Sequence, residues 1–427
     1  MKRREFLKGM AATGAAASMT GGLGVISKSA HAADKVDFGQ VKGLEVEVLS
    51  ETSWFDNDIF KKNLMDYGGA MTNQYTIPWD WNNAGGYMTK ITVYPLEGDP
   101  KILLMDTGWN NEWVDYIYDE KSDMGKLLTS GKVDTMILSH WHLDHYWGVE
   151  STLKRSPKIT MYAPKTYFEE DMKLLKGGQN VAKTKDGKEV VINKNGTPHQ
   201  GKLVLTDPKG EKGDTIYRLM PGVAVKMYDV PILLRVRGEN VLYFNVKDKG
   251  IVTVTGCCHP GILTLNAWAR RNVKDYKPYG CYGGLHITLF ETWDPKFDDI
   301  IKGVKAFQLK KVGCNHCTGW IWGEKASAAG VPIVKGTDKY KSYKRTSTVA
   351  KASNVFLTNG DTVVFSPVSR AAGRRGPAAP PPAPRRPARY GRPPRAPPAR
   401  RAAPPARVPQ GGGGGSATAP PQWGQAV

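Results

Sequence analysis

Cysteine is scarce in this chain, with five residues among 427. An odd number cannot be consumed by a complete disulfide framework, and four of the five lie in short motifs that also contain histidine. Cys314 and Cys317 form the only Cys-x-x-Cys pair, so a four-cysteine zinc site would have to recruit distant residues. We expect Cys257, Cys258, Cys314 and Cys317 to pack or to support a neighbouring site. A structural zinc half-site or a redox pair is the alternative for the last two.

The chain also lacks a long, strongly apolar run. Residues 9–27 are uncharged, but they are rich in Gly, Ala and Thr and would partition poorly into hydrocarbon. Arg3 and Arg4 precede them, and Ala30-His31-Ala32 supplies a small-x-small cleavage pattern. Residues 1–32 are therefore expected to be an export signal that resembles the twin-arginine type, although Lys2 departs from its pattern. The twin-arginine export machinery would then be a partner. The mature protein would be periplasmic or secreted, with no stable membrane insertion after cleavage.

The C-terminal segment has no Lys, Asp or Glu. Residues 370–427 contain eleven Arg and fifteen of the 29 Pro, and they include five consecutive glycines. Such a segment has no apolar face to offset the entropy lost on ordering, so we expect a disordered tail. Its basicity could attract nucleic acid or an anionic surface, but a solvated tail is the preferred interpretation. The abrupt change in composition also suggests foreign or misread coding sequence.

Net charge gives little reason to expect a nucleic-acid partner. The tail contributes +11 and residues 1–32 contribute +4 to the formal charge of +20, which leaves only +5 for the body. Residues 33–369 are long enough for one large α/β domain with its own core. We expect a small-molecule substrate for this domain and no nucleic acid.

The alternation of apolar residues predicts strands before helices in the first half and an alternation of the two in the second half. Strands are predicted at Leu44–Leu49, Met88–Tyr94, Lys101–Met105, Thr135–Leu138, Ile159–Tyr162, Val223–Tyr228, Leu233–Val236, Val241–Phe244, Ile251–Val254, Phe307–Val312, Val331–Val334 and Thr362–Phe365. Helices are predicted at Glu112–Thr129, Lys165–Leu175, Ile262–Val273, Pro295–Val304 and Gly323–Ala329. Residues 176–215 have little periodicity and indicate a surface insertion or lid. The pattern suits two sheets with helices outside them.

Six of the eight histidines fall in four short motifs. Together with the aspartate of the first motif, they give seven candidate metal ligands: His140, His142, Asp144, His145, His259, His286 and His316. The first motif follows an apolar strand, so its ligands would lie on a loop above a sheet edge. A structural zinc site is usually filled by four ligands rich in Cys, whereas here histidine predominates and there are more candidates than one ion needs. The sequence therefore predicts two ions, most simply zinc, with positions open to water and substrate.

His140-x-His142-x-Asp144-His145, preceded by Asp106-Thr107-Gly108, resembles the metallo-β-lactamase superfamily of metal-dependent hydrolases. The later motifs look more narrowly like the branch that includes dihydropterin ribofuranosyl-aminobenzene phosphate synthases. The resemblance implies an αββα sandwich of two mixed sheets with the metals at one edge.

The resemblance also implies a division of ligands. One ion would bind His140, His142 and His259, and the other would bind Asp144, His145 and His316. Asp106 would support a ligand by a hydrogen bond. The bridging Asp that most members carry has no convincing match here, and His286 occupies its place in the order of the chain. Both the role of His286 and the number of ions depend on this departure.

Hydrolysis is the chemistry that this interpretation favours. A hydroxide on zinc would attack an ester, lactone, amide, or phosphate or sulfate ester, and Asp144 would act as the catalytic residue that orients it or shuttles its proton. Iron or manganese could replace zinc, and persulfide-oxidising members share the first motif. An iron-dependent oxidoreductase, a nuclease and a non-catalytic metal-binding protein are the alternatives.

Removal of residues 370–427 should leave the thermal stability and the turnover nearly unchanged, because this segment offers no apolar face for packing. Thermal melts and rate measurements on the truncated and full-length chains check this. A large loss of either quantity would show that the segment is part of the fold.

Overall fold

The computed structural model describes residues 35–52, 58–78, 85–183, 186–193, 196–337 and 353–366. The expected export signal and the expected tail lie outside these ranges. Within them, no helix combines the length and the apolar character needed to cross a membrane.

Thirteen strands form one mixed sheet, and two more form a separate hairpin. The strands are β1 (Val41–Ser50), β2 (Met88–Pro95), β3 (Lys101–Met105), β4 (Val133–Ile137), β5 (Thr160–Pro164), β6 (Asn180–Lys183), β7 (Glu189–Ile192), β8 (Leu203–Thr206), β9 (Tyr217–Met220), β10 (Val223–Pro231), β11 (Arg237–Val246), β12 (Gly250–Thr255), β13 (Pro278–Gly284), β14 (Lys311–Asn315) and β15 (Thr362–Phe365). β2 pairs antiparallel with β1 and β3, and β11 pairs antiparallel with β12, whereas β1 and β11 meet in parallel. At the two ends of the sheet, β3-β4-β5-β8 and β12-β13-β14 run parallel.

The two halves of the sheet meet at a single residue pair, Val41 of β1 and Val246 of β11. A core cluster that includes Val46, Phe244 and Val252 draws on strands of both halves and lies between them. Burial on both faces explains the almost continuous apolar sequence of β12, in which every residue is buried. The two halves are therefore the facing layers of a sandwich.

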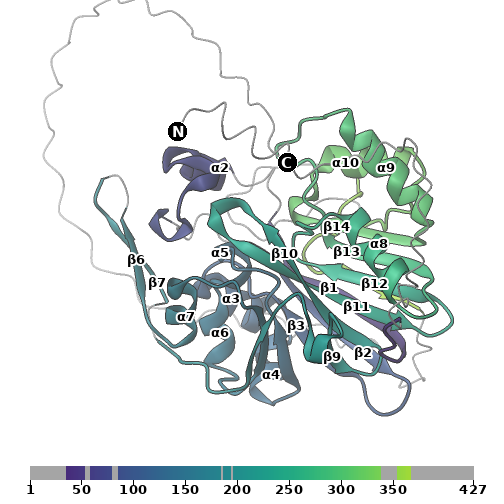
Figure 1. The fold of residues 1–427 in the computed structure, drawn as a ribbon. Helices are drawn as coiled ribbons and strands as arrows, with labels where there is room; N and C mark the ends of the chain where they lie inside the picture. Colours follow the sequence, from purple (N-terminus) through teal and green to yellow (C-terminus); the bar gives the residue numbers. More distant parts are fainter. Residues whose placement is uncertain are drawn as a thin grey trace, which may run out of the picture. The chain divides into compact units, whose positions relative to one another are not determined.

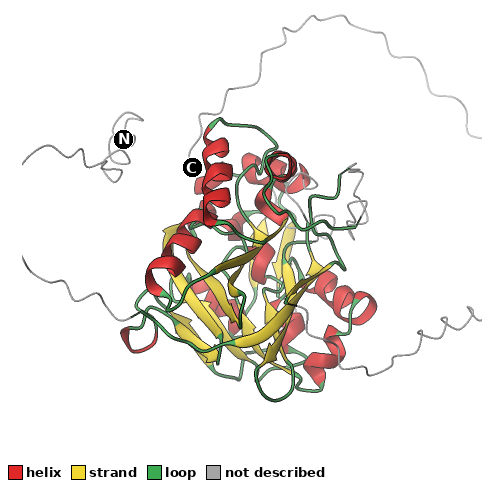
Figure 2. Ribbon diagram, turned by 90° about the vertical axis from the view of Figure 1, so that its right-hand side faces the viewer, coloured by secondary structure: helices red, strands yellow, loops and turns green. Residues whose placement is uncertain are grey.

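Helices cover the outer face of each layer (Figures 1 and 2). The α-helices are α2 (Asp58–Asp66), α3 (Asn111–Tyr116), α4 (Met124–Thr129), α5 (Leu143–Tyr146), α6 (Val149–Leu153), α7 (Glu169–Leu175), α8 (Ile262–Asn272), α9 (Lys296–Phe307) and α10 (Trp320–Ala328). Helices α3, α4, α6 and α7 pack on the β3–β5 side in one core cluster, and α8, α9 and α10 pack on the β11–β14 side in another. The α/β sandwich with outer helices that was predicted from the sequence is thus confirmed.

Two predicted strands are wrong, and a third begins later than predicted. Leu233–Val236 is a 3-10 turn, η8 (Leu233–Arg235), in which Leu234 and Arg235 have positive φ, because these residues make the connection between β10 and β11. Phe307 still belongs to α9, and the next strand begins only at Lys311. Val331–Val334 is not a strand, and Ile333 makes a single bridge to Val312.

The predicted helix Glu112–Thr129 divides into α3, a π-helical turn η6 (Ile117–Lys121) and α4. Lys165–Leu175 begins four residues later than predicted, as α7. The region 176–215 is more regular than expected, because it contains the β6–β7 hairpin and β8, which joins the main sheet beside β5. Strand β13 was missed, and its glycines explain why, since they weaken any strand signal.

The parallel strands gather the predicted site at one edge of the sandwich. Asp106 follows β3, Ser139–His145 follow β4, His259 follows β12, His286 follows β13 and His316 follows β14. Carboxyl ends of parallel strands open at the same edge of a sheet, so residues far apart in the chain come together there.

Gly86 determines how closely β2 approaches the loop that carries Asp144. Its φ is +68°, and a Cβ atom there would lie 2.1 Å from the Asp144 carbonyl oxygen. The next residue, Tyr87, donates its backbone N–H to the same oxygen at 2.9 Å. Only glycine permits both the conformation and the approach.

Gly86→Ala should therefore destabilise the protein by more than the 1–2 kcal/mol typical of a left-handed alanine, and should also displace the Asp144 loop. Gly131→Ala is the matched control, because Gly131 has φ +69° with no atom within 4 Å of the added Cβ. Chemical unfolding and metal affinity measure the two effects. Equal costs for the two variants would contradict this account.

Candidate metal centre

All six motif histidines lie in one contiguous cluster. Ring centroids are 4.1 Å apart for His140 and His145, 4.9 Å for His140 and His259, 5.0 Å for His145 and His316, and 4.3 Å for His259 and His286. The centroid of the sixth ring, that of His142, is 4.7 Å from the centroid of the His140 ring. The structure therefore brings together every histidine that the sequence singled out as a ligand, although their role as ligands stays a prediction.

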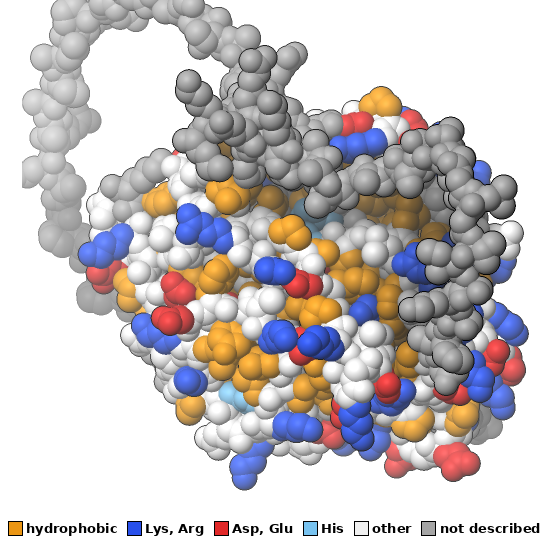
Figure 3. All heavy atoms as spheres, viewed as in Figure 1, with side chains coloured by type: hydrophobic (Ala, Val, Ile, Leu, Met, Phe, Trp, Pro, Cys, Tyr) orange, Lys and Arg blue, Asp and Glu red, His pale blue; other side chains and the backbone are white. Residues whose placement is uncertain are grey.

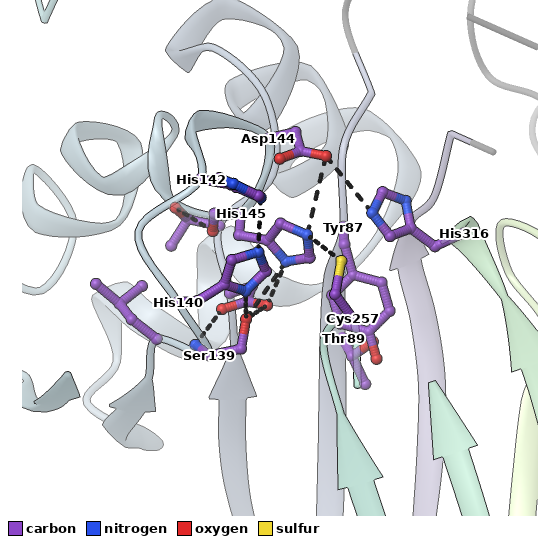
Figure 4. A network of polar contacts seen from close by, with 12 residues as sticks. Tyr87, Thr89, Ser139, His140, His142, Asp144, His145, Cys257 and His316 are labelled. Carbon is purple, nitrogen blue, oxygen red and sulfur yellow. Dashed lines mark hydrogen bonds and ion pairs between the residues drawn. The ribbon is translucent and has the colours of Figure 1, made fainter. Parts of the chain in front are cut away.

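Asp106 and Ser139 fix the orientation of two of these rings. The Asp106 carboxylate accepts the Ser139 backbone N–H at 2.7 Å and the Ser139 hydroxyl at 2.6 Å. It also accepts the Nδ1–H of His145 at 2.7 Å. Because the serine hydroxyl proton is already used, its oxygen accepts the Nδ1–H of His140 at 2.9 Å. Both rings are thus held with Nε2 free to act as an acceptor (Figure 4).

Backbone carbonyl groups orient two further rings. Leu233 O lies 2.7 Å from His142 Nε2, and Thr52 O lies 3.1 Å from His316 Nδ1. A carbonyl oxygen only accepts, so each of these ring nitrogens carries the proton. The lone pairs of His142 Nδ1 and His316 Nε2 therefore face the cluster.

The inward nitrogens form pairs of acceptors that have no proton between them. His140 Nε2 and His142 Nδ1 are 3.0 Å apart, and the proton of each ring is committed on its other side. The buried His259 Nε2 has no hydrogen-bond partner among the described residues. Two converging lone pairs repel one another unless a cation lies between or beside them. This donor set fits a divalent metal ion.

The second group of donors surrounds Asp144. Its Oδ2 atom lies 3.5 Å from His316 Nε2 and 3.8 Å from His145 Nε2, and the three side chains come from two distant loops. In Figure 4 the Asp144 carboxylate points between these two rings. Asp144 therefore lies near His145 and His316, and the division of the ligands between two ions stays a prediction.

Burial holds the imidazoles neutral. Desolvation lowers the pKa of all six, to about 4 for His142 and His316 and to about 3 for His286. Neighbouring imidazoles lower the pKa further at His140, where a second positive charge would be repelled. Neutral imidazole is the form that binds metal, so these rings need to lose no proton near pH 7.

Burial shifts the pKa of the two aspartates in the opposite direction, upward. Burial raises the pKa of Asp144 to about 7 and raises that of Asp106 well above its usual value, although hydrogen bonds from Ser139 oppose the second shift. A buried carboxylate without a cation is disfavoured in its charged form. Bound metal would supply the missing positive charge at Asp144.

Glu239 supports the second ligand loop and was not found by sequence reasoning. This buried β11 residue accepts the backbone N–H groups of Cys257 at 3.0 Å, Cys258 at 2.8 Å and His259 at 2.6 Å. It also accepts the Thr255 hydroxyl at 2.8 Å. Three consecutive donors require a turn, and Cys258 has φ +58° there. A glutamate inside an apolar strand was the only signal in the sequence.

The cysteines occupy two different environments. All five are free thiols. Cys258 and Cys314 pack with the α8–α10 layer, and the Cys314 thiol donates to Val355 O at 3.2 Å. Cys257 and Cys317 instead border the histidines, with Cys257 Sγ 3.1 Å from His145 Nε2. The Cys-x-x-Cys pair is thus divided: Cys314 packs in the core, whereas Cys317 and Cys257 lie beside the histidines, and both positions fall within the packing or supporting roles expected.

Comparisons with known proteins find a matching family model, a curated relative and similar solved structures. The model of the Metallo-beta-lactamase superfamily matches residues 89–242, which include the first histidine motif but not His259, His286 or His316. A curated relative from Methanocaldococcus jannaschii is 29% identical over 314 residues, covering 67% of this chain and 91% of the relative. It is named 7,8-dihydropterin-6-methyl-4-(beta-D-ribofuranosyl)-aminobenzene-5'-phosphate synthase.

Two solved structures are also similar. One is a metal-dependent hydrolase of the beta-lactamase superfamily, with 15% identity, a TM-score of 0.40, and coverage of 76% of this chain and 100% of that chain. The other is an N-acyl homoserine lactone hydrolase with its product bound at the catalytic metal centre, with 15% identity and a TM-score of 0.28. That match covers 51% of this chain and 76% of the other.

Asp106→Asn should weaken metal binding about 10–100-fold, the range typical for loss of a residue that orients a ligand, because an amide cannot accept all three hydrogen bonds. Titration against a chelator measures this affinity. Asp171→Asn is the control, since Asp171 is equally buried and accepts the Tyr146 hydroxyl at 2.7 Å, but is no part of the cluster. Equal losses of affinity in both variants would indicate general core damage rather than ligand orientation.

Proposed function

We propose that this chain is a metal-dependent enzyme of the metallo-β-lactamase superfamily, and that it hydrolyses a small molecule at a pair of zinc ions. One observation carries the proposal. Ring nitrogens from separate loops converge as bare acceptors, His140 Nε2 and His142 Nδ1 at 3.0 Å, while their protons are tied to protein oxygens outside the cluster. Such an arrangement is stable only with cations.

The donors suit zinc better than a hard cation. Neutral imidazole is a borderline-soft ligand, whereas magnesium and calcium prefer oxygen donors. His140, His142 and His259 would hold one ion. Asp144, His145 and His316 would hold the other, and the carboxylate makes the second position the more negative one. His286 lies beside His259, with ring centroids 4.3 Å apart, and would limit access to the first ion or bind it.

When bound, zinc ions polarise an electrophilic oxygen and lower the pKa of water to about 7. The protein supplies orientation and proton handling. Asp144 has an 11% exposed side chain, whereas those of His145 and His316 are 0% and 1% exposed. The Asp144 carboxylate therefore lies toward the solvent side, where it can hold a proton between the attacking water and the departing group.

The substrate class that this chemistry serves is an ester, lactone, amide, or phosphate or sulfate ester. On the face shown in Figure 3, Lys and Arg side chains are interspersed with acidic and apolar ones. That distribution supports a small substrate rather than nucleic acid, which would require a continuous basic surface.

The curated relative supports a second candidate. Its match spans 91% of the relative, and its name describes a synthase of an aminobenzene ribofuranosyl phosphate joined to a reduced pterin. In such a synthase reaction, the same two ions would activate a nucleophilic group of one substrate in place of water.

Substrate panels on zinc-reconstituted protein separate the two candidates. We expect turnover of an ester, lactone, amide or phosphate ester, and its loss together with bound metal in His142→Ala. His199→Ala is the control, because His199 lies outside the cluster and its ring contacts Ile159 O at 2.7 Å. Product formation only from a pterin and an aminobenzene phosphate would favour the synthase. Metal content at the wild-type level in His142→Ala would contradict the site itself.

A further inference from the structure

Cys257 borders the histidine cluster and contacts one of its rings directly. It immediately follows the β12 end, its side chain is buried, and its Sγ atom is 3.1 Å from His145 Nε2. Figure 4 shows the sulfur on the same side of the cluster as Asp144 and His316. The thiol thus donates a hydrogen bond to the one ring nitrogen of His145 that has no proton of its own.

The position of this sulfur is shared between the two groups of donors. Sγ lies within 4.8 Å of ligand atoms of both His140 and His259, which belong to the first group. It also lies within 4.8 Å of ligand atoms of both His145 and His316, which belong to the second. None of the four histidines is part of both sets. The sulfur is therefore the atom common to both.

Among the residues that the structure describes, no carboxylate lies near both groups of donors. The bridging aspartate suggested by the resemblance has no counterpart in the sequence, and Asp144 contacts only His145 and His316 among the histidines. A thiolate is a strong ligand for zinc, iron and cobalt. Given Zn–S of about 2.3 Å and Zn–N of about 2.0 Å, sulfur and nitrogen ligands of one ion lie roughly 3.5 Å apart. The observed separation from His145 Nε2 is close to this value.

The surrounding loop holds Cys257 in place from two sides. Glu239 accepts its backbone N–H at 3.0 Å, and the Cys317 thiol donates to its carbonyl oxygen at 3.5 Å. Among the described residues, the sulfur of Cys317 lies within 4.8 Å of ligand atoms of His286 and Cys257. It is not part of either of the two histidine groups. Cys317 thus positions the loop, whereas Cys257 offers the ligand atom.

We propose that Cys257 is a metal ligand, and that its thiolate would be shared by the two ions of the proposed site. The inference rests on the proposed two-metal site. On binding, two sulfur–metal bonds form, the S–H bond breaks and its proton passes to solvent. The shared thiolate and Asp144 together neutralise two of the four positive charges of a pair of divalent ions. This ligand selects thiophilic metals and excludes magnesium and calcium.

X-ray absorption on the full-length, zinc-loaded wild-type chain tests the proposal without any variant. We expect a sulfur neighbour at about 2.3 Å from zinc in addition to nitrogen and oxygen. Titration with cobalt separates a bridge from a terminal ligand. Thiolate-to-cobalt charge-transfer absorption should increase over both equivalents of metal, whereas a terminal thiolate would saturate after one.

Three substitutions identify the sulfur. Cys257→Ser should abolish the sulfur signal and the charge-transfer band. Cys258→Ser, the adjacent buried thiol, and Cys317→Ser should keep both. Two bound zinc ions without sulfur in the wild-type protein would overturn the proposal and leave the metal site standing. Loss of sulfur in Cys317→Ser but not in Cys257→Ser would also overturn it. Wild-type protein that binds no zinc would sink both this inference and the proposed function.

Discussion

The gathering of six imidazoles, four of them buried, and a buried carboxylate at one edge of a sandwich is the constraint on which the rest of this structure depends. Each ring is desolvated, so each is neutral, and the inward nitrogens repel one another as lone pairs. The cost of this arrangement is offset only by cations. Metal binding would therefore contribute to the stability of the folded chain as well as to its chemistry.

The protein meets this constraint by directing the ring protons of four imidazoles away from the cluster. Asp106 and Ser139 serve two rings, and the carbonyl groups of Leu233 and Thr52 serve two more. These acceptors come from strand ends and turns whose own backbone is fixed by the sheet. Among the residues of the site, Asp106, His286 and His316 have backbone conformations in the left-handed region. Local strain of this kind persists where the surrounding fold over-determines it.

Much of the fold followed from the sequence because burial leaves a direct record there. Strands such as β12, buried on both faces, read as apolar runs, and the histidine motif stood out after the β4 run. The sequence failed where local pattern and tertiary context disagree. Leu233–Val236 has strand-like residues but makes a connection, and the glycines of β13 conceal a central strand. No local pattern could show that Cys257 faces the cluster while Cys258 faces the core, since adjacent residues differ only in how the turn directs them.

The seam between the two sheet halves gives the cluster a mechanical role. Four donors, from His140 to His145, come from the first half, and His259, His286 and His316 come from the second, more than a hundred residues later. The halves share a single backbone pairing, Val41 with Val246. A pair of ions bound by ligands from both halves would hold the two halves together at this contact. The ligand set is complete only after His316 has left the ribosome, when almost the entire domain has been synthesised. Metal binding would therefore mark the last stage of assembly.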